Sequence, residues 1–477
     1  MNRRNIWIHI SIALVIIGVA ALAGQISRWK SATRTTISEK TSKIPTKPVV
    51  VQRSANEREA EVLVKFKPNV SLADIKKIAA KNNDAIEDEI ETVKGLVAID
   101  DLDNADAKKV AEQYSQMSDL VVYAEPNFEI KLNDPNELTS PKDLLSRDVP
   151  SLTAPNDPMF ADQWALNNAG QNGGKQKADI GALQAWAKTT GSKKVVIAVL
   201  DTGVDYTHND LSTNIWTRPD SLPAYKDDEL GTVNDQYGFN ADDNQSDPMD
   251  DNGHGTHCAG VIGAEGDNDE GIAGINWNVE IMPLKFLGRS GSGTTKNAIE
   301  SINYAIERKK AGVNVRVISA SWGSTAYSKA LEDAIRAAGE QGILFVAAAG
   351  NDGTSNDKRP HYPSNYDLPN VISVAALDRS DNLASFSNFG VKSVHIAAPG
   401  KDILSTWLKD SYREASGTSM ATPQVAGVAG LILAAEPNMT VEKLRDRLLK
   451  SVDKIDSLNG KVESGGRLNA AKALGIK

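Results

Sequence analysis

V-V-I-A-V-L at residues 195–200 is a short run of β-branched and small apolar residues that ends directly in Asp201. Three runs of the same kind follow later in the chain, at 315–319, 343–349 and 371–375. Helical patterns lie between them, most clearly at 296–310 and 328–341. Such runs are typical of strands buried on both faces of a parallel sheet. The sequence therefore predicts an α/β domain whose mostly parallel sheet carries helices on both faces.

Length and composition set the broad class of the protein. The 477 residues exceed one ordinary domain, and 40% hydrophobic with 24% charged residues is the composition of a soluble globular protein. The formal net charge of −9 provides no basic field, so we expect no nucleic-acid partner. The single cysteine, Cys258, excludes an intrachain disulfide and a cysteine-based zinc cluster.

The N-terminal segment predicts export. Residues 1–24 have a basic start, an apolar run from residue 6 and a small-residue end, which is typical of a secretory signal peptide. Because the run approaches the length of a bilayer span, an uncleaved membrane anchor is the alternative. We therefore expect a secreted, extracellular protein, or one anchored to the cell membrane. Residues 25–58 are polar and aperiodic and are expected to form a flexible linker.

Residues 59–132 predict a small α+β domain with the ferredoxin-like order β-α-β-β-α-β. Strands are expected at 62–66, 91–93, 96–99 and 120–124. One helix should begin after Ser71, with Asp74 in its first turn, and a second should span 105–118. Residues 133–156 are polar and proline-rich, so we expect an exposed, cleavable connector before the large domain at 157–477.

Two motifs place an acidic residue and a histidine where α/β sheets hold their sites. D-T-G at 201–203 directly follows the first strand, and N-G-H-G-T-H-C-A-G at 252–260 surrounds His254 with small residues. A carboxylate at a strand end can be held rigidly enough to orient a histidine. Taken alone, D-T-G is explained as well by an Asx turn or a metal ligand, and a lone histidine is usually surface or core. His257 is expected to face the core.

Two further motifs supply a serine and an asparagine. G-T-S-M-A-T-P at 417–423 precedes an apolar stretch, which predicts Ser419 at the start of a buried helix. The unpaired backbone N–H of Ser419 can there stabilise an oxyanion. A-A-G-N-D-G at 348–353 closes another strand and offers the Asn351 amide as a second donor. By themselves, the serine would be a helix cap and the asparagine part of a turn.

Together these four motifs closely resemble the subtilisin-like serine proteases (subtilases), in particular the thermitase-like branch. Aspartate, histidine, asparagine and serine occur in the order of that family, and the resemblance extends from about residue 157 to 474. It implies a serine endopeptidase acting on proteins or peptides. Ser419 would attack the peptide carbonyl, His254 would transfer the proton, and Asp201 would orient His254. Asn351 and the Ser419 N–H would hold the oxyanion.

The resemblance also implies a substrate cleft. Its substrate-pairing segment and S1 pocket walls would be Ser321, Trp322, Gly323, Ala348 and Gly350. His361 stands where the family often has a small residue at the floor of the S1 pocket. This departure puts the P1 preference in doubt, and our hypothesis is a broad preference with some apolar bias.

Structural Ca²⁺ is the implied cofactor. E-G-D-N-D-E-G-I at 265–272 resembles the calcium loop of thermitase-type members. Its ligands would here be the carboxylates of Asp157 and Asp210, the side-chain oxygen of Asn268, and the backbone carbonyls of Glu265, Glu270 and Ile272. Oxygen donors of these kinds suit a hard cation, although a solvated acidic loop is the alternative. A second site within 240–252 matches only partly, at Asn240, Asp243 and Asp247, and a solvated loop explains these residues equally well.

By the same resemblance, the unit at 59–132 looks like an inhibitor-I9-like propeptide, a partner in cis that assists folding and inhibits the protease until it is cut. Processing is then expected between about residues 130 and 155. A monomer is expected, which would contact a membrane only if the N-terminal segment stays uncleaved. Cys258 is expected to be a buried small hydrophobe.

Two rival functions use the same residues differently. A metallohydrolase would take His254, His257, Asp201 and Asp205 as ligands, but it leaves Ser419 without a role, and the sequence has no H-E-x-x-H. A degenerate binding or inhibitory protein is the other rival. Nothing motivates it, because every proposed catalytic position holds a chemically competent residue.

Overall fold

The computed structural model describes residues 61–135, 154–227, 230–242 and 246–476. The expected signal segment, the linker and most of the connector lie outside these described residues. The small domain (61–126) and the large domain (154–476) belong to one compact unit, so contacts between them are contacts within that unit.

The small domain has the predicted β-α-β-β-α-β order and one four-stranded sheet, β2-β3-β1-β4. Its elements are β1 (Val62–Phe66), α2 (Leu72–Lys81), β2 (Asp84–Glu89), β3 (Leu96–Asp101), α3 (Ala107–Ser115) and β4 (Val121–Pro126). Ser71 caps α2 by accepting a hydrogen bond from the Asp74 N–H at 3.2 Å, as expected.

The prediction of a strand at 91–93 is wrong. These residues form a turn closed by backbone hydrogen bonds from Val93 to Ile90 and from Leu96 to Val93. Ile90 and Val93 are apolar because they pack in a core shared with the large domain, and the strand lies earlier, in the acidic sequence of β2. Apolar patterning missed β2 because β2 contains only two apolar residues.

Nine strands form the sheet of the large domain, in the order β18-β19-β15-β14-β13-β12-β6-β10-β9. Their bounds are β6 (Gly191–Asp201), β9 (Phe239–Asn240), β10 (Asn278–Lys285), β12 (Val315–Ala320), β13 (Leu344–Ala348), β14 (Val371–Leu377), β15 (Ile396–Pro399), β18 (Val452–Lys454) and β19 (Gly466–Leu468). All pairings are parallel except that of β18 with β19. The four predicted runs are the adjacent strands β14, β13, β12 and β6, which confirms the predicted fold class.

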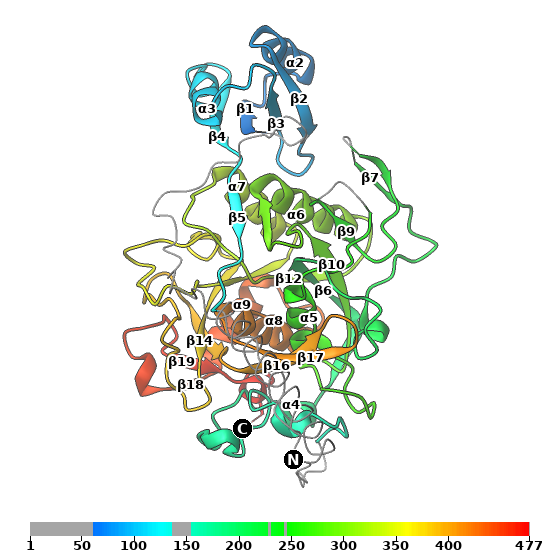
Figure 1. Ribbon diagram of the computed structural model, residues 1–477, viewed down its shortest axis with the longest axis vertical. Helices are drawn as coiled ribbons and strands as arrows, with labels where there is room; N and C mark the ends of the chain where they lie inside the picture. Colours follow the sequence, from blue (N-terminus) through cyan, green and yellow to red (C-terminus); the bar gives the residue numbers. More distant parts are fainter. Residues whose placement is uncertain (1–60, 136–153, 228–229, 243–245, 477) are drawn as a thin grey trace, which may run out of the picture. The chain divides into compact units, whose positions relative to one another are not determined.

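Helices cover both faces of this sheet (Figure 1). Two pack on one face, α5 (His254–Gly263) and α8 (Thr418–Ala435), and two on the other, α6 (Thr295–Lys310) and α7 (Lys329–Glu340). Alternate residues of β6 join different cores: Ile197 packs with α5 and α8, and Ala198 packs with α6 and α7. Burial on both faces explains the continuous apolar sequence of β6.

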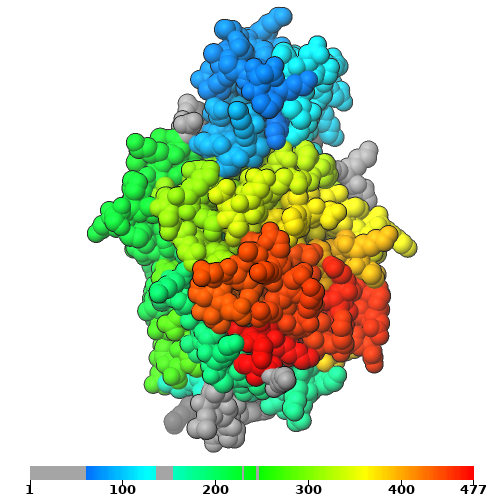
Figure 2. Space-filling model, turned by 180° about the vertical axis from the view of Figure 1, so that it is seen from behind, coloured from blue at the N-terminus to red at the C-terminus, as the bar shows by residue number. Residues whose placement is uncertain are grey.

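Within the described residues, α8 is the one helix long and apolar enough to cross a membrane, and 89% of it is buried inside the protein. The shorter helices are α4 (Ala182–Trp186), α9 (Val441–Lys450) and α10 (Ala470–Ala473). From behind, α9 in orange and the C-terminal segment in red form adjoining parts of the surface (Figure 2). Three two-stranded sheets complete the fold: β5 (Glu129–Lys131) with β11 (Ser292–Thr294), β7 (Tyr225–Asp227) with β8 (Gly231–Val233), and β16 (Ile403–Trp407) with β17 (Ser411–Ala415).

Side chains of the small domain and of Asn127, which directly follows it, cap two helices of the large domain. The Glu125 carboxylate accepts hydrogen bonds from Ser328 Oγ at 2.5 Å and from the backbone N–H groups of Lys329 and Ala330, at the start of α7. Asn127 Oδ1 accepts the Lys296 N–H at the start of α6. Because the first N–H groups of a helix have no partner within the helix, these contacts join the domains through groups that otherwise need water.

Candidate active site

Asp201 and His254 are joined directly. Asp201 ends β6 and is fully buried, and His254 Nδ1 donates to its Oδ1 at 2.7 Å. The start of α5 lies so close to the loop after β6 that a Cβ on Gly255 would strike the Gly203 carbonyl oxygen. The small residues beside His254 are therefore required for this approach, as the sequence predicts.

Ser419 lies in the first turn of α8 and is buried. Its hydroxyl lies 3.0 Å from the Ser321 carbonyl oxygen and donates to Asp134 Oδ1 at 2.6 Å. Asp134 belongs to the connector between the two domains. Its other oxygen, Oδ2, forms an ion pair with His254 Nε2 at 2.8 Å. One carboxylate thus contacts both the serine and the histidine.

Asn351 follows β13 and completes the ring of donors around Asp134. Its Nδ2 donates to Asp134 Oδ1 at 2.9 Å and to the Asn133 carbonyl oxygen at 3.1 Å. Asn351 Oδ1 accepts the Thr418 N–H at 2.8 Å, which turns the amide nitrogen toward the site. Polar hydrogens of Ser419 and Asn351 therefore converge on one place, as an oxyanion site requires.

The residues just before the connector lead to this place as an extended strand. β5 pairs antiparallel with β11, where Ile130 stands opposite Gly293, and the Leu132 N–H then donates to the Gly291 carbonyl oxygen at 2.9 Å. Ile130 is buried. The connector predicted from residue 133 begins with the exposed Asn133 and the half-buried Asp134, which this pairing places at the site. No motif marked Asp134, and an acidic residue beside Pro135 looks like an ordinary turn.

The predicted substrate cleft is partly filled by protein side chains. Trp322 is buried, its indole donates to the Leu200 carbonyl oxygen at 2.8 Å, and its ring packs on Phe286. The Ser321 hydroxyl donates to the Ser419 carbonyl oxygen at 2.8 Å. Because both side chains make contacts within the protein, a substrate would contact this segment, residues 321–323, through its backbone.

His361 lies between the two predicted walls of the S1 pocket. A Cβ on Gly323 would strike its ring, and a Cβ on Gly350 would lie 3.0 Å from the ring. The imidazole is 9% exposed, and burial lowers its pKa to about 4, partly offset by a hydrogen bond with the backbone of Ala348. Its Nδ1 has no hydrogen-bond partner among the described residues. A neutral ring thus occupies space that a small residue would leave open.

The predicted calcium loop surrounds two buried carboxylates. Asp210 accepts the Ile272 N–H and the Asn268 amide, each at 3.0 Å, and Asp157 accepts the Asp267 N–H at 2.8 Å. Burial raises the pKa of Asp157 to about 6 and that of Asp210 to about 7. Asp157 Oδ1 is buried and has no partner in the described part of the chain. Such a group of acidic oxygens fits a bound cation.

One other predicted ligand of this loop, the side-chain oxygen of Asn268, has a protein partner. Asn268 Oδ1 accepts the Glu270 N–H at 2.9 Å. The amide oxygen of Asn268 is therefore already engaged by a backbone N–H in this arrangement.

The second predicted site fits a cation less well. Asp247 Oδ1 accepts hydrogen bonds from the Tyr206 hydroxyl at 3.1 Å and from the Met249 N–H at 3.0 Å. Asn240 Nδ2 donates to the Asp247 carbonyl oxygen at 2.9 Å. Asp243 lies outside the described residues. The described oxygens are held by protein donors.

The metallohydrolase ligands do not assemble into one site. His257 is fully buried and its Nε2 donates to the Ile403 carbonyl oxygen at 2.9 Å, and burial lowers its pKa to about 4. Asp205 accepts hydrogen bonds from Thr207 and from the Lys409 N–H. Cys258 lies beside Asp201 and His254, but burial raises the pKa of its thiol to about 12.

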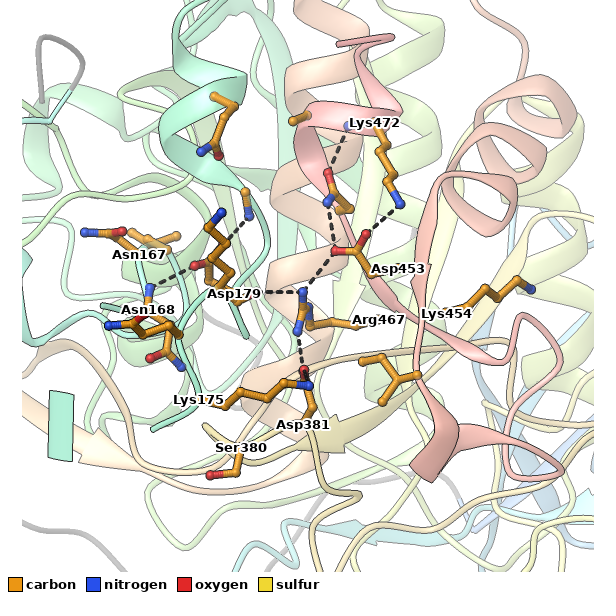
Figure 3. A pocket seen from close by; sticks show the side chains of 18 of the residues that line it. Asn167, Asn168, Lys175, Asp179, Ser380, Asp381, Asp453, Lys454, Arg467 and Lys472 are labelled. Carbon is orange, nitrogen blue, oxygen red and sulfur yellow. Dashed lines mark hydrogen bonds and ion pairs between the residues drawn. The ribbon is translucent and has the colours of Figure 1, made fainter. Parts of the chain in front are cut away.

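A polar cavity of about 890 Å³ lies elsewhere on the large domain (Figure 3). The buried Arg467 reaches into it, pairing with Asp381 and, at 2.9 Å, with Asp453. Lys472 binds the other oxygen of Asp453 at 2.6 Å. None of the proposed catalytic residues lines this cavity, and ion pairs of Arg467 and Lys472 with acidic residues occupy part of its wall. These ion pairs therefore join the C-terminal segment to the rest of the large domain.

Comparison with known proteins agrees with the site geometry. Residues 192–471 match the subtilase family, and residues 45–127 match the fervidolysin N-terminal prodomain. The thermophilic serine proteinase of Bacillus sp. strain AK1 is 41% identical over 290 residues, which cover 61% of this chain and 64% of that protein. Thermitase of Thermoactinomyces vulgaris is 38% identical over 322 residues, which cover 67% of this chain and 99% of thermitase.

A solved structure is also similar. A protease from Pseudoalteromonas arctica has a TM-score of 0.55 and 31% sequence identity, over 68% of this chain and 99% of that one. The subtilase match alone covers more than half of the chain and includes the positions of Asp201, His254, Asn351 and Ser419. The prodomain match overlaps the small domain, which agrees with the predicted propeptide. The chain belongs to the subtilase family.

Proposed function

We propose that this chain is a secreted serine endopeptidase that cuts its own prodomain from a precursor. One observation carries the proposal: Ser419 Oγ, His254 Nε2 and Asn351 Nδ2 all lie within 2.9 Å of one Asp134 carboxylate. His254 Nδ1 in turn lies 2.7 Å from Asp201. A nucleophile, a base, its orienting carboxylate and an oxyanion donor thus share one site.

The chemistry follows from these positions. Once Asp134 has left, the Ser419 hydroxyl attacks a peptide carbonyl carbon while His254 Nε2 takes its proton. Asn351 Nδ2 and the Ser419 N–H donate to the oxyanion, and Asp201 stabilises the imidazolium. His254 passes the proton to the leaving amine as the peptide bond breaks. Water then releases the acyl group from Ser419 by the same steps.

Asn133–Asp134 is the bond that we assign to self-processing. The Asn133 carbonyl oxygen already accepts a hydrogen bond from Asn351 Nδ2 at 3.1 Å, the donor proposed for the oxyanion. Pairing of β5 with β11 and the contact from Leu132 to Gly291 hold the preceding residues as an extended strand. Extended peptides bind in this way, because main-chain hydrogen bonds fix the position of the reacting carbonyl.

Structural Ca²⁺ and export complete the proposal. Asp157 and Asp210 would hold the ion, with Asn268, Glu265, Glu270 and Ile272 nearby. When bound, the ion would supply positive charge that stabilises these two buried carboxylates in their ionised form. The basic and apolar start of the sequence supports secretion, and the relatives include an extracellular halolysin-like protease of Natrialba magadii.

Replacing the nucleophile tests the function. The Ser419→Ala precursor should stay uncut and leave casein intact, whereas the wild type should lose its prodomain and digest casein. Ser301→Ala is a suitable control, because it also removes a buried hydroxyl, which donates to the Asn297 carbonyl oxygen within α6. If the Ser419→Ala protein processes itself and digests casein like the wild type, the proposal fails.

A further inference from the structure

Both imidazole nitrogens of His254 face carboxylate oxygens. Nδ1 lies 2.7 Å from Asp201 Oδ1, and Nε2 lies 2.8 Å from Asp134 Oδ2. An ionised carboxylate only accepts hydrogen bonds, so an N–H attracts it and the lone pair of a bare ring nitrogen repels it. The pair at Nε2 is an ion pair rather than an aligned hydrogen bond, yet the same sign of interaction applies. With both carboxylates ionised, this arrangement fits His254 as the imidazolium, with hydrogen on both nitrogens.

The other groups around His254 do not oppose this charge. Cys258 is buried with a raised pKa and stays a neutral thiol, and His257 is buried with a lowered pKa and stays neutral. Burial alone lowers the pKa of His254, but its neighbours Asp201, Cys258 and Asp134 outweigh burial and raise it well above its ordinary value. Two carboxylates are thus the charged groups that face this imidazole, one on each nitrogen.

We propose that Ser419, His254 and Asn351 form a receptor for a side-chain carboxylate, and that Asp134 fills it and keeps the precursor latent. The inference rests on the proposed function. An imidazolium cannot accept the Ser419 proton, and the Ser419 hydroxyl is itself turned to Asp134 Oδ1. Asp134 therefore disables the base and the nucleophile together, and it directly follows the bond assigned to self-processing.

The protonation of His254 determines how the rate of self-processing depends on pH. The Asp134–His254 ion pair, which we call the lock, needs a protonated His254, so it holds only below the raised pKa of His254. As the pH rises through that pKa, Nε2 loses its proton, the attraction to Asp134 ends, and His254 becomes a base. Processing of the wild-type precursor should therefore accelerate with rising pH.

Asp134→Asn tests the lock, because it removes the charge and keeps the size. In full-length protein followed by gel and mass spectrometry between about pH 5 and 9, we expect processing at neutral pH to accelerate about tenfold or more. The midpoint of the pH–rate profile should move down by about one to three pH units. Glu112→Gln makes the same change of charge at an exposed position of α3 and should process like the wild type. Asp134→Ser repeats the test if the asparagine variant fails to fold.

A second measurement reads the protonation of His254 without any cleavage. NMR titration of the full-length Ser419→Ala precursor, with and without Asp134→Asn, should give a lower His254 pKa when Asp134 is replaced. If the pH–rate profile and the His254 titration both stay unchanged, the lock is refuted while the protease proposal stands. Slower processing with an unchanged titration also refutes it. Processing by the Ser419→Ala precursor would instead refute the proposed function.

Discussion

Pro423 follows Ser419 by one turn of α8, and its missing amide hydrogen leaves the Ser419 carbonyl oxygen without the usual helical partner. Two side chains from other elements take its place: Ser321 Oγ donates at 2.8 Å, and Cys258 Sγ lies at 3.6 Å. Cys258 lies one turn after His254 in α5. The backbone of the proposed nucleophile is thus tied to the helix that carries the proposed base, which fixes their relative position.

Replacing Ser321 should remove the hydrogen bond to the Ser419 carbonyl oxygen and leave the reacting side-chain atoms unchanged. In Ser321→Ala the buried Ser419 carbonyl oxygen keeps only the weak thiol donor, so we expect kcat to fall about tenfold with little change in KM. Steady-state kinetics on a peptide substrate measures both constants. Ser301→Ala, which removes a comparable hydroxyl in α6, should leave both unchanged. A rise in KM at constant kcat would show instead that Ser321 acts on substrate binding.

His361 should restrict the P1 residue. Its ring occupies space between Gly323 and Gly350, so His361→Gly should admit larger side chains. We expect the ratio of kcat/KM for phenylalanine over alanine at P1 to rise about tenfold or more. Matched peptides that differ only at P1 provide the measurement and its internal control. An unchanged ratio would mean that the S1 pocket lies elsewhere.

Glu125 should hold the prodomain on the protease. Glu125→Gln weakens a carboxylate that accepts three hydrogen bonds at the start of α7, at a cost of about 1–3 kcal/mol. In the uncut Ser419→Ala precursor, hydrogen exchange at Lys329 and Ala330 should therefore accelerate. Glu112→Gln, on an exposed position of α3, is the matched control. Equal protection from hydrogen exchange in the Ser419→Ala precursor and in its Glu125→Gln and Glu112→Gln variants would contradict a role of Glu125 in domain contact.

Calcium should stabilise the protein through Asp210. Saturating Ca²⁺ should raise Tm of the Ser419→Ala protein by about 5–10 °C, because a ligand that binds only the folded state stabilises it by mass action. Asp210→Asn should abolish most of this rise, whereas Asp247→Asn in the second loop should retain it. Calorimetry with calcium or with a chelator measures the difference. A full calcium response in Asp210→Asn would place the ion elsewhere.

Much of the fold could be predicted because its signals are local. The run that forms β6 is apolar on both faces, and the small residues around His254 are demanded by the close approach of Gly255 to Gly203. The four motifs are each contiguous, so their positions at strand ends and helix starts could be inferred from the sequence.

Features that depend on tertiary contact could not be predicted. β2 was not predicted, because pairing with β3, rather than an apolar pattern, holds it in the sheet. The direction of the Trp322 side chain could not be predicted, because its ring packs on Phe286 in the core. Asp134 had no local signal at all, because its partners Ser419, His254 and Asn351 are distant in the sequence.

Labelling by a serine-directed fluorophosphonate tests the central claim most directly. The reagent reacts with a serine hydroxyl only where a neighbouring base activates it, so mature wild-type protein should lose its activity and carry one adduct on Ser419, located by peptide mass spectrometry. His254→Ala should not be labelled. Full peptidase activity after treatment, or an adduct on a different serine accompanied by inactivation, would contradict the account.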